Sequence, residues 1–202
     1  GQYNFGQDLL GDLERVEVLR GPASSIYGSD AIGGVINLIP RRGAETPFEG
    51  YYDVSLGDLE TRRGSVGAAG SIGGLSYGVS LEAFDSEGFD QIPERFALRT
   101  GDPDGATITT ISGTARYTLT DSFSIDGLIR FREATSEFDT FSGGPTFSLR
   151  ADDPDLEVDY DRYTVGRLGA DWRLSDGLSV RASFGRMNNE RAETNGGVRT
   201  SS

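Results

Sequence analysis

After residue 47, apolar and polar residues alternate along the chain with a period of two. Such alternation is typical of β-strands that have one apolar and one polar face. No charged residue stands in the middle of an apolar face. Seven segments keep a single parity and predict strands near residues 51–56, 62–72, 75–83, 111–119, 123–132, 167–174 and 178–184.

The connections between these segments are of two kinds. Gly73-Gly74, Asp121-Ser122 and Asp176-Gly177 are expected to be tight hairpin turns. Long polar loops are expected at 86–106 and 134–160, and the chain after 184 is expected to lie in a further loop. Only the connection near 57–60 is short on that side. Short turns at one rim and long loops at the other are typical of an outer-membrane β-barrel.

Alternation alone is compatible with two arrangements. A soluble β-sandwich buries its apolar face against a second sheet, whereas a membrane barrel turns that face to lipid and encloses a polar lumen. Aromatic residues beside the short turns favour the barrel, because aromatic girdles lie at membrane interfaces; they are Tyr117, Phe123 and Trp172. The lumen would then hold Arg130, Arg132, Arg173, Arg181, Asp126 and Asp171.

Seven strands are too few for a closed barrel, because an open edge in lipid leaves backbone groups unpaired. We therefore predict an all-β fold that is part of a transmembrane antiparallel β-barrel. Before it, residues 13–20 read as a strand, "ASSIYG" as a short helix or turn, and "AIGGVINLI" as a strand. No run of 18 apolar residues predicts a membrane-spanning helix. Any export signal is expected outside this sequence.

Composition excludes several classes of function. The net charge of −13 argues against a nucleic-acid partner, since phosphate binding requires clustered basic residues. With no Cys and no His, the sequence contains neither a Ser-His-Asp triad nor a Cys-His pair nor a His-ligated zinc site. We expect no catalytic residues, no metal site and no cofactor. The protein is therefore expected not to be an enzyme.

Two motifs resemble ligand loops but depart from them. Gly28 to Gly33 has the glycine spacing of a phosphate-binding loop, yet Gly34 and Val35 stand where Lys and Ser or Thr are needed. "DPDG" at 102–105 begins like a calcium loop without its later ligands, and we expect a turn. The acidic run 152–161 is expected to be a solvated loop, with calcium binding as the alternative.

The stretch "LERVEVLRGPASSIYGSDAIGGVINLI", residues 13–39, resembles the C-terminal end of the plug domain of TonB-dependent outer-membrane receptors. The resemblance implies that residues 1–43 are the C-terminal part of an α+β plug and residues 44–202 the start of a barrel of about 22 strands. It also implies a place in the outer membrane of a Gram-negative bacterium, in contact with lipid and lipopolysaccharide.

In this family the plug closes the barrel, a scarce ligand binds above it, and the TonB energy-transducing complex rearranges the plug through a TonB box that this sequence lacks. The resemblance favours a ferric siderophore as the small-molecule ligand. Cobalamin, haem or carbohydrate uptake are the alternatives within the family, and the ligand-binding residues are not identified. A barrel enzyme, an adhesin and a soluble β-sandwich remain the other classes.

Residue roles follow from the resemblance only where the motif matches. Arg20 corresponds to a plug arginine that pairs with barrel glutamates and holds the plug in place, and Glu17 is expected to join that network. The alternative is that both are ordinary charges on a hydrated strand. A group of plug glycines is expected to serve backbone turns and close packing: Gly21, Gly28, Gly33 and Gly34.

Overall fold

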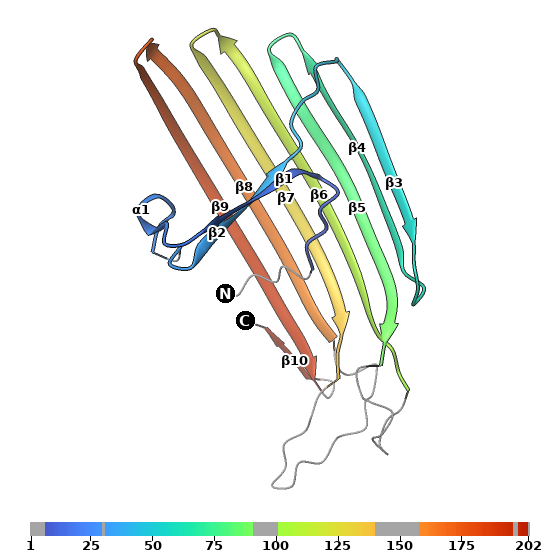
Figure 1. Cartoon of the computed structure of the whole chain (residues 1–202). Coiled ribbons are helices and arrows are strands. Elements are labelled where there is room, and N and C mark those ends of the chain that lie inside the picture. The colour runs from blue at the N-terminus through green and yellow to red at the C-terminus, as the bar shows by residue number, and fades with distance from the viewer. Residues whose placement is uncertain (1–6, 30, 91–100, 140–157, 196–197, 202) are drawn as a thin grey trace.

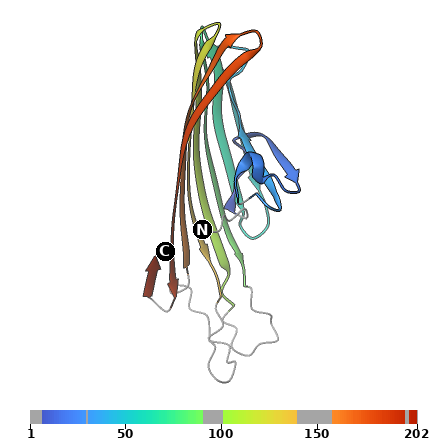
Figure 2. The same ribbon diagram turned by 90° about the vertical axis from the view of Figure 1, so that its left-hand side faces the viewer.

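The computed structural model describes residues 7–29, 31–90, 101–139, 158–195 and 198–201. A two-stranded hairpin lies on one face of a single eight-stranded antiparallel sheet (Figures 1 and 2). The hairpin consists of β1 (Leu13–Arg20), the short helix α1 (Ser24–Tyr27) and β2 (Gly34–Pro40). The sheet follows in chain order: β3 (Glu49–Leu56), β4 (Arg62–Ile72), β5 (Leu75–Phe89), β6 (Asp104–Thr120), β7 (Phe123–Glu137), β8 (Val158–Ser175), β9 (Leu178–Asn195) and β10 (Val198–Ser201).

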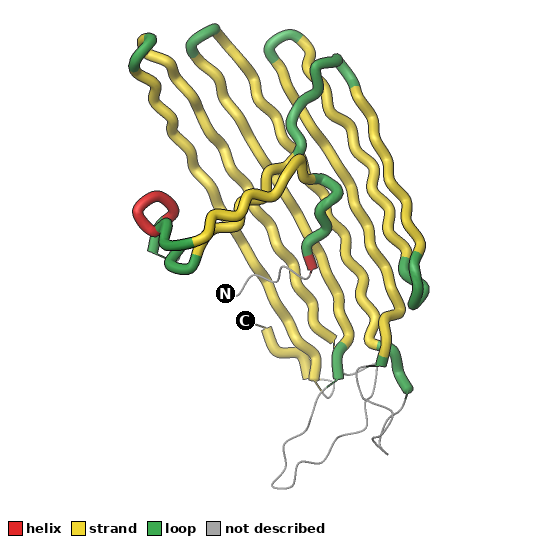
Figure 3. Tube along the Cα trace, viewed as in Figure 1, coloured by secondary structure: helices red, strands yellow, loops and turns green. Residues whose placement is uncertain are grey.

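All seven predicted strands are present, and the three predicted hairpin turns join them at one rim (Figure 3). Gly73 has φ 58°, a conformation that favours glycine in a tight turn. Within the part of the chain that the structure describes, no helix is long and apolar enough to span a membrane.

The predicted loops at 86–106 and 134–160 were too long. β5 continues to Phe89, β6 already begins at Asp104 inside the expected "DPDG" turn, and β8 begins at Val158. The chain after 184 is also wrongly predicted as loop, because β9 continues to Asn195 and β10 follows. In these extensions both faces of a strand carry polar residues, so the apolar signal of period two disappears although the backbone pairing continues.

The two faces of the sheet differ in chemistry and surroundings. One face, here called the outer face, is apolar and exposed: the exposed fraction is 60% for Ile129, 69% for Leu168 and 74% for Phe184. The opposite, inner face is polar and carries the hairpin (Figure 2). A soluble sandwich requires a second sheet on the apolar face. In the described ranges the one other sheet, β1–β2, lies on the inner face instead.

The apolar part of the outer face forms a band of limited height. On β5, β6 and β7 it covers 75–83, 111–119 and 123–131, nine residues on each strand. Nine residues rise about 31 Å along a strand, and a tilt of about 40° reduces this to about 24 Å, close to the apolar band of outer-membrane barrels.

Polar and aromatic residues mark the two limits of this apolar band. Toward the long connections, Arg162 on the outer face pairs with Glu133 at 3.0 Å and with Glu190 at 4.0 Å. At the short-turn rim, the rings of Phe123 and Trp172 pack edge to face with centroids 6.2 Å apart. This is the arrangement expected where a membrane-facing band meets an interface.

Placing a charge in the apolar band should destabilise the protein in lipid. Ala115→Arg puts a cation at mid-height of the band on β6 and is expected to lower the unfolding free energy in phospholipid vesicles by about 2–4 kcal/mol. Thr107→Arg is the matched control, since it lies on the same strand and face beyond the band, beside Asp85. Its expected effect is below about 1 kcal/mol. Equal losses in denaturant titrations would contradict the position of the band.

Candidate functional site

Two stretches of the N-terminal part rest on the inner face of the sheet. Residues 7–12, here called the leading segment, precede β1, and residues 41–47, here called the connector, lie between β2 and β3 (Figure 1). Leu9 of the leading segment packs with Ile108, Ala134 and Phe84 in a small apolar core. The remaining contacts of both stretches are polar, so the interface is predominantly polar.

A buried charge cluster joins the leading segment to β7 and β8. It consists of Asp8, Asp12, Arg130, Arg132 and Asp161, and the side chains are 1–8% exposed. Burying charges is costly unless they are paired and hydrogen-bonded. The alternation along β7 places both arginines on the inner face, where carboxylates of the leading segment reach them.

Arg130 and Asp12 form one half of the cluster. Arg130 Nη2 lies 3.6 Å from Asp12 Oδ1 and 3.5 Å from Asp8 Oδ1, and it donates to the Leu9 carbonyl at 3.0 Å. The Ser112 hydroxyl donates to Asp12 Oδ2 at 2.7 Å. Asp12 is therefore held by β6 and β7 at once.

Arg132 forms the other half of the cluster. Its Nη1 lies 3.3 Å from Asp8 Oδ1, and its Nη2 donates to Asp161 Oδ1 at 2.7 Å. The guanidinium also lies over the Tyr163 ring, 5.4 Å from the ring centroid. One guanidinium thus bridges a carboxylate of the leading segment and a carboxylate of the sheet.

A further buried acid, Glu82 on β5, holds the turn of the leading segment. Gly11 N–H donates to Glu82 Oε2 at 2.9 Å, while Arg63 donates to Oε1 from Nε at 2.8 Å. A side chain at position 11 would place a Cβ 2.9 Å from Glu82 Oε1, so glycine permits this approach. The contact joins a sheet glutamate to the leading segment through a backbone N–H.

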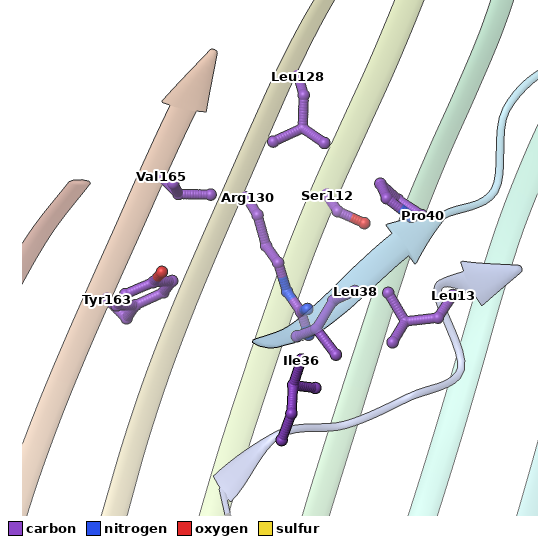
Figure 4. Close-up of a pocket in the computed structure, with 9 residues that line it drawn as sticks. All are labelled: Leu13, Ile36, Leu38, Pro40, Ser112, Leu128, Arg130, Tyr163 and Val165. Atoms are coloured by element: carbon purple, nitrogen blue, oxygen red, sulfur yellow. The ribbon is translucent and has the colours of Figure 1, made fainter. Parts of the chain in front are cut away.

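Between the hairpin and the sheet lies a cavity of about 290 Å³ (Figure 4). The hairpin side is apolar, while Arg130 and Tyr163 contribute polar groups from the sheet side. The complete lining is Leu13, Ile36, Leu38, Pro40, Ser112, Leu128, Arg130, Tyr163 and Val165. Both strands of the hairpin and strands β6, β7 and β8 therefore line this cavity.

The connector is attached by neutral hydrogen bonds. Gly43 N–H donates to the Tyr77 carbonyl at 3.2 Å, and Ser71 N–H donates to the Thr46 carbonyl at 2.9 Å. The Thr114 hydroxyl donates to the Arg41 carbonyl at 3.0 Å. These bonds fix the connector to β4, β5 and β6.

Two strand glycines admit the connector to close range. A Cβ on Gly70 would lie 2.1 Å from the Pro47 carbonyl oxygen, and a Cβ on Gly78 would lie 2.7 Å from that of Arg41. Both distances are shorter than real side chains tolerate. The connector backbone therefore occupies space that any other residue at these positions would fill.

Arg20 and Glu17, the charges that the resemblance assigned to plug locking, lie on β1. Arg20 is exposed, and among the described residues no ion pair joins it to a sheet carboxylate. Glu17 accepts hydrogen bonds from Arg15 at 2.8 Å and Asn37 at 3.2 Å, all within the hairpin. The bond from Arg15, followed by that from Asn37, lowers the pKa of the Glu17 carboxyl. Their locking role stays a prediction.

The four glycines that the resemblance assigns to backbone turns differ in backbone conformation. Gly21, Gly28 and Gly34 have φ of 102°, 92° and 148°, in the region that favours glycine. Gly33 does not, and its carbonyl accepts the Gly21 N–H at 3.3 Å. Gly34 also approaches the Leu19 carbonyl oxygen so closely that a Cβ would lie 2.5 Å from it.

The acidic run 152–161 is only partly described. Residues 152–157 lie outside the described residues, whereas 158–161 are strand, so the prediction of a solvated loop is wrong there. Asp159 is bonded by Arg191 at 2.8 and 3.0 Å, and Asp161 by Arg132. Arginines on the inner face pair with both carboxylates.

Sequence reasoning missed Asp8 and Asp12. They precede the motif in a stretch without strand periodicity, and no local pattern marks them. The available signal was on the partner: Arg130 and Arg132 are two residues apart on one face of a predicted strand, and such guanidiniums require carboxylates when covered.

Comparisons with known proteins agree with the sequence resemblance. Residues 2–35 match the TonB-dependent Receptor Plug Domain family. The chain is 31% identical over 182 residues to the vitamin B12 transporter BtuB of Vibrio vulnificus, covering 87% of this chain and 28% of that protein. It is 40% identical over 75 residues to an iron-regulated outer membrane virulence protein of Vibrio cholerae, covering 36% and 11%.

The fold has a counterpart among solved structures. The siderophore receptor PiuA from Acinetobacter baumannii superposes with a TM-score of 0.71 at 15% identity, covering 90% of this chain and 27% of that one. The chain spans about a quarter of the length of the vitamin B12 transporters that it matches.

Removing one cation from the buried cluster should be costly. Arg130→Ala leaves Asp12 buried without its ion pair and is expected to lower the unfolding free energy by about 3–5 kcal/mol. Arg181→Ala is the control, since its side chain is 73% exposed beside Asp171, and about 1 kcal/mol or less is expected. Urea titration of both variants in vesicles measures the difference, and similar losses would argue against the cluster.

The connector contact predicts opposite effects for two glycine substitutions. Gly78→Ala should lower the unfolding free energy by about 1–3 kcal/mol, because its Cβ overlaps the Arg41 carbonyl. Gly64→Ala, which meets open space on β4, should be neutral or raise it by up to about 1 kcal/mol. Urea titration of both variants in vesicles measures the two unfolding free energies. An equal decrease for Gly64→Ala and Gly78→Ala would contradict the close approach of the connector.

Proposed function

We propose that this chain, a member of the TonB-dependent receptor family, works in an outer-membrane receptor that imports a ferric siderophore by energy-coupled rearrangement of its plug. In this proposal residues 1–43 belong to the plug and residues 44–202 to the barrel. The outer face contacts lipid and lipopolysaccharide, and the TonB complex supplies the energy. No catalytic step is involved.

The position of the leading segment carries the proposal. It lies on the polar face of a sheet whose opposite face exposes an apolar band, and it is held there by Asp8 and Asp12. A segment in that position occupies the aqueous side of a membrane wall. Transport past it requires these contacts to change, which makes the interface a two-state element that a ligand and an energy source can both bias.

The similarity to an iron-regulated outer membrane protein supports a ferric ligand. The similarity to vitamin B12 transporters extends over more of the chain and makes cobalamin the second candidate. Both ligands are scarce, and both are too large for the narrow pores through which small solutes diffuse. The two candidates therefore share the mechanism and differ in what the loops bind.

Uptake by a deletion strain tests the proposal. We expect a strain without this receptor to lose accumulation of radioactive iron from at least one purified ferric siderophore, and complementation to restore it. Radiolabelled cobalamin is measured in the same cells. Loss of cobalamin uptake alone would establish the second candidate, and unchanged uptake of both would contradict the proposed function.

A further inference from the structure

The leading segment and the connector are attached to the same face by different chemistry. The leading segment is held chiefly by buried ions, and the connector by hydrogen bonds of its backbone and the close approach at Gly78. One backbone bond, from Arg41 N–H to the Asp12 carbonyl at 3.0 Å, joins the two stretches. Both attachments cover β6, where Ser112 lies under Asp12 and Thr114 under the Arg41 carbonyl. A single strand therefore reports on both.

Burial changes the cost of separating each attachment. When the leading segment leaves the sheet and water enters, Asp12 and Arg130 regain the hydration that burial removed, and this offsets the lost pairing. Deleting one partner gives no such compensation, because the other charge stays buried. Removing one charge of the cluster therefore costs much free energy, whereas separating the whole cluster into water costs little.

The connector has no comparable compensation. Its amide and carbonyl groups bond Tyr77, Ser71 and Thr114, and separation exchanges these neutral bonds for bonds to water while also losing the close packing of backbone against backbone. The connector would have to part from β4, β5 and β6 together. The connector is therefore the attachment that persists.

From this difference we propose that Asp8 and Asp12 are positioning residues of a releasable latch, and that the connector is a fixed anchor. Resting on the proposed function, the energy-driven step separates residues 7–12 from the inner face and breaks the bond from Arg41 N–H to the Asp12 carbonyl, while residues 41–47 stay bound to the sheet. Release exposes Arg130 to the lumen and leaves the plug tethered to the barrel, so that it returns to the same place.

Cysteine accessibility in the whole receptor tests the order of release. The sequence contains no Cys, so Ser112→Cys and Thr114→Cys each introduce a single thiol, at positions 7% and 8% exposed. Cells supplied with ferric siderophores are treated with a water-soluble maleimide, with and without a protonophore. Energised cells are expected to label position 112 at least about tenfold faster, as a shift of about 1.4 kcal/mol in an opening equilibrium would, with position 114 unchanged.

A further cysteine position and a charge variant distinguish release of the leading segment from misfolding of a single cysteine variant. Thr110→Cys lies on the same strand between Glu82 and Arg132, is 1% exposed, and matches Thr114→Cys in chemistry. In a variant that carries Asp8→Asn and Asp12→Asn, the maleimide should label positions 110 and 112 even in the presence of the protonophore. Position 114 should stay protected.

Each outcome has one meaning. Labelling at 114 together with 110 and 112 overturns the anchor while leaving energy-coupled uptake intact. Labelling at 114 alone, or protection of all three positions in cells that accumulate iron, overturns the latch. Absence of both iron uptake and any energy-dependent labelling overturns the proposed function itself.

Discussion

Side-chain alternation across one antiparallel sheet is the constraint on which the other features depend. Because successive side chains point to opposite faces, each strand serves two environments at once, apolar outside and polar inside. Backbone hydrogen bonding does not depend on which environment a side chain meets. It continues for six or more residues beyond the apolar band on β7 and β9. The band therefore sets the height of the lipid contact, while hydrogen bonding sets the length of the strands.

The same alternation explains why the contact with the leading segment is ionic. Inner-face positions are available to charged residues, so Arg130 and Arg132 come to lie side by side with Glu82 across β5 to β7. Covering them with an apolar segment would leave charges unpaired in a poorly hydrated space. The leading segment instead brings two carboxylates and a backbone N–H, and Leu9 adds an apolar contact.

The strands near the short turns were predictable from the sequence, because there one face meets an apolar medium and the period of two is visible. The extensions around Val158 and beyond Phe184 were not, since polar residues on both faces erase that period. The residues of the candidate site likewise include some that the sequence predicted and some that it did not. Arg130 and Arg132 were placed correctly on the polar face, whereas Asp8 and Asp12 gained their role only from tertiary contact. Gly70 and Gly78 carry no local signal of the backbone that passes over them.

Glycines serve close packing within the strands of this protein as well as its turns. Gly67 lies beneath the Tyr51 ring, where a Cβ would meet ring atoms at 2.3 Å, and the Arg41 guanidinium stacks on that ring, 4.6 Å from its centroid. Gly78 lies under the connector on the same face as Gly67, whereas Gly70 meets the Pro47 carbonyl on the opposite face of β4, beside the Tyr77 hydroxyl. Glycines at these three strand positions let neighbouring backbone and ring atoms pack closely against the sheet, which explains how a segment without regular secondary structure can hold a fixed place.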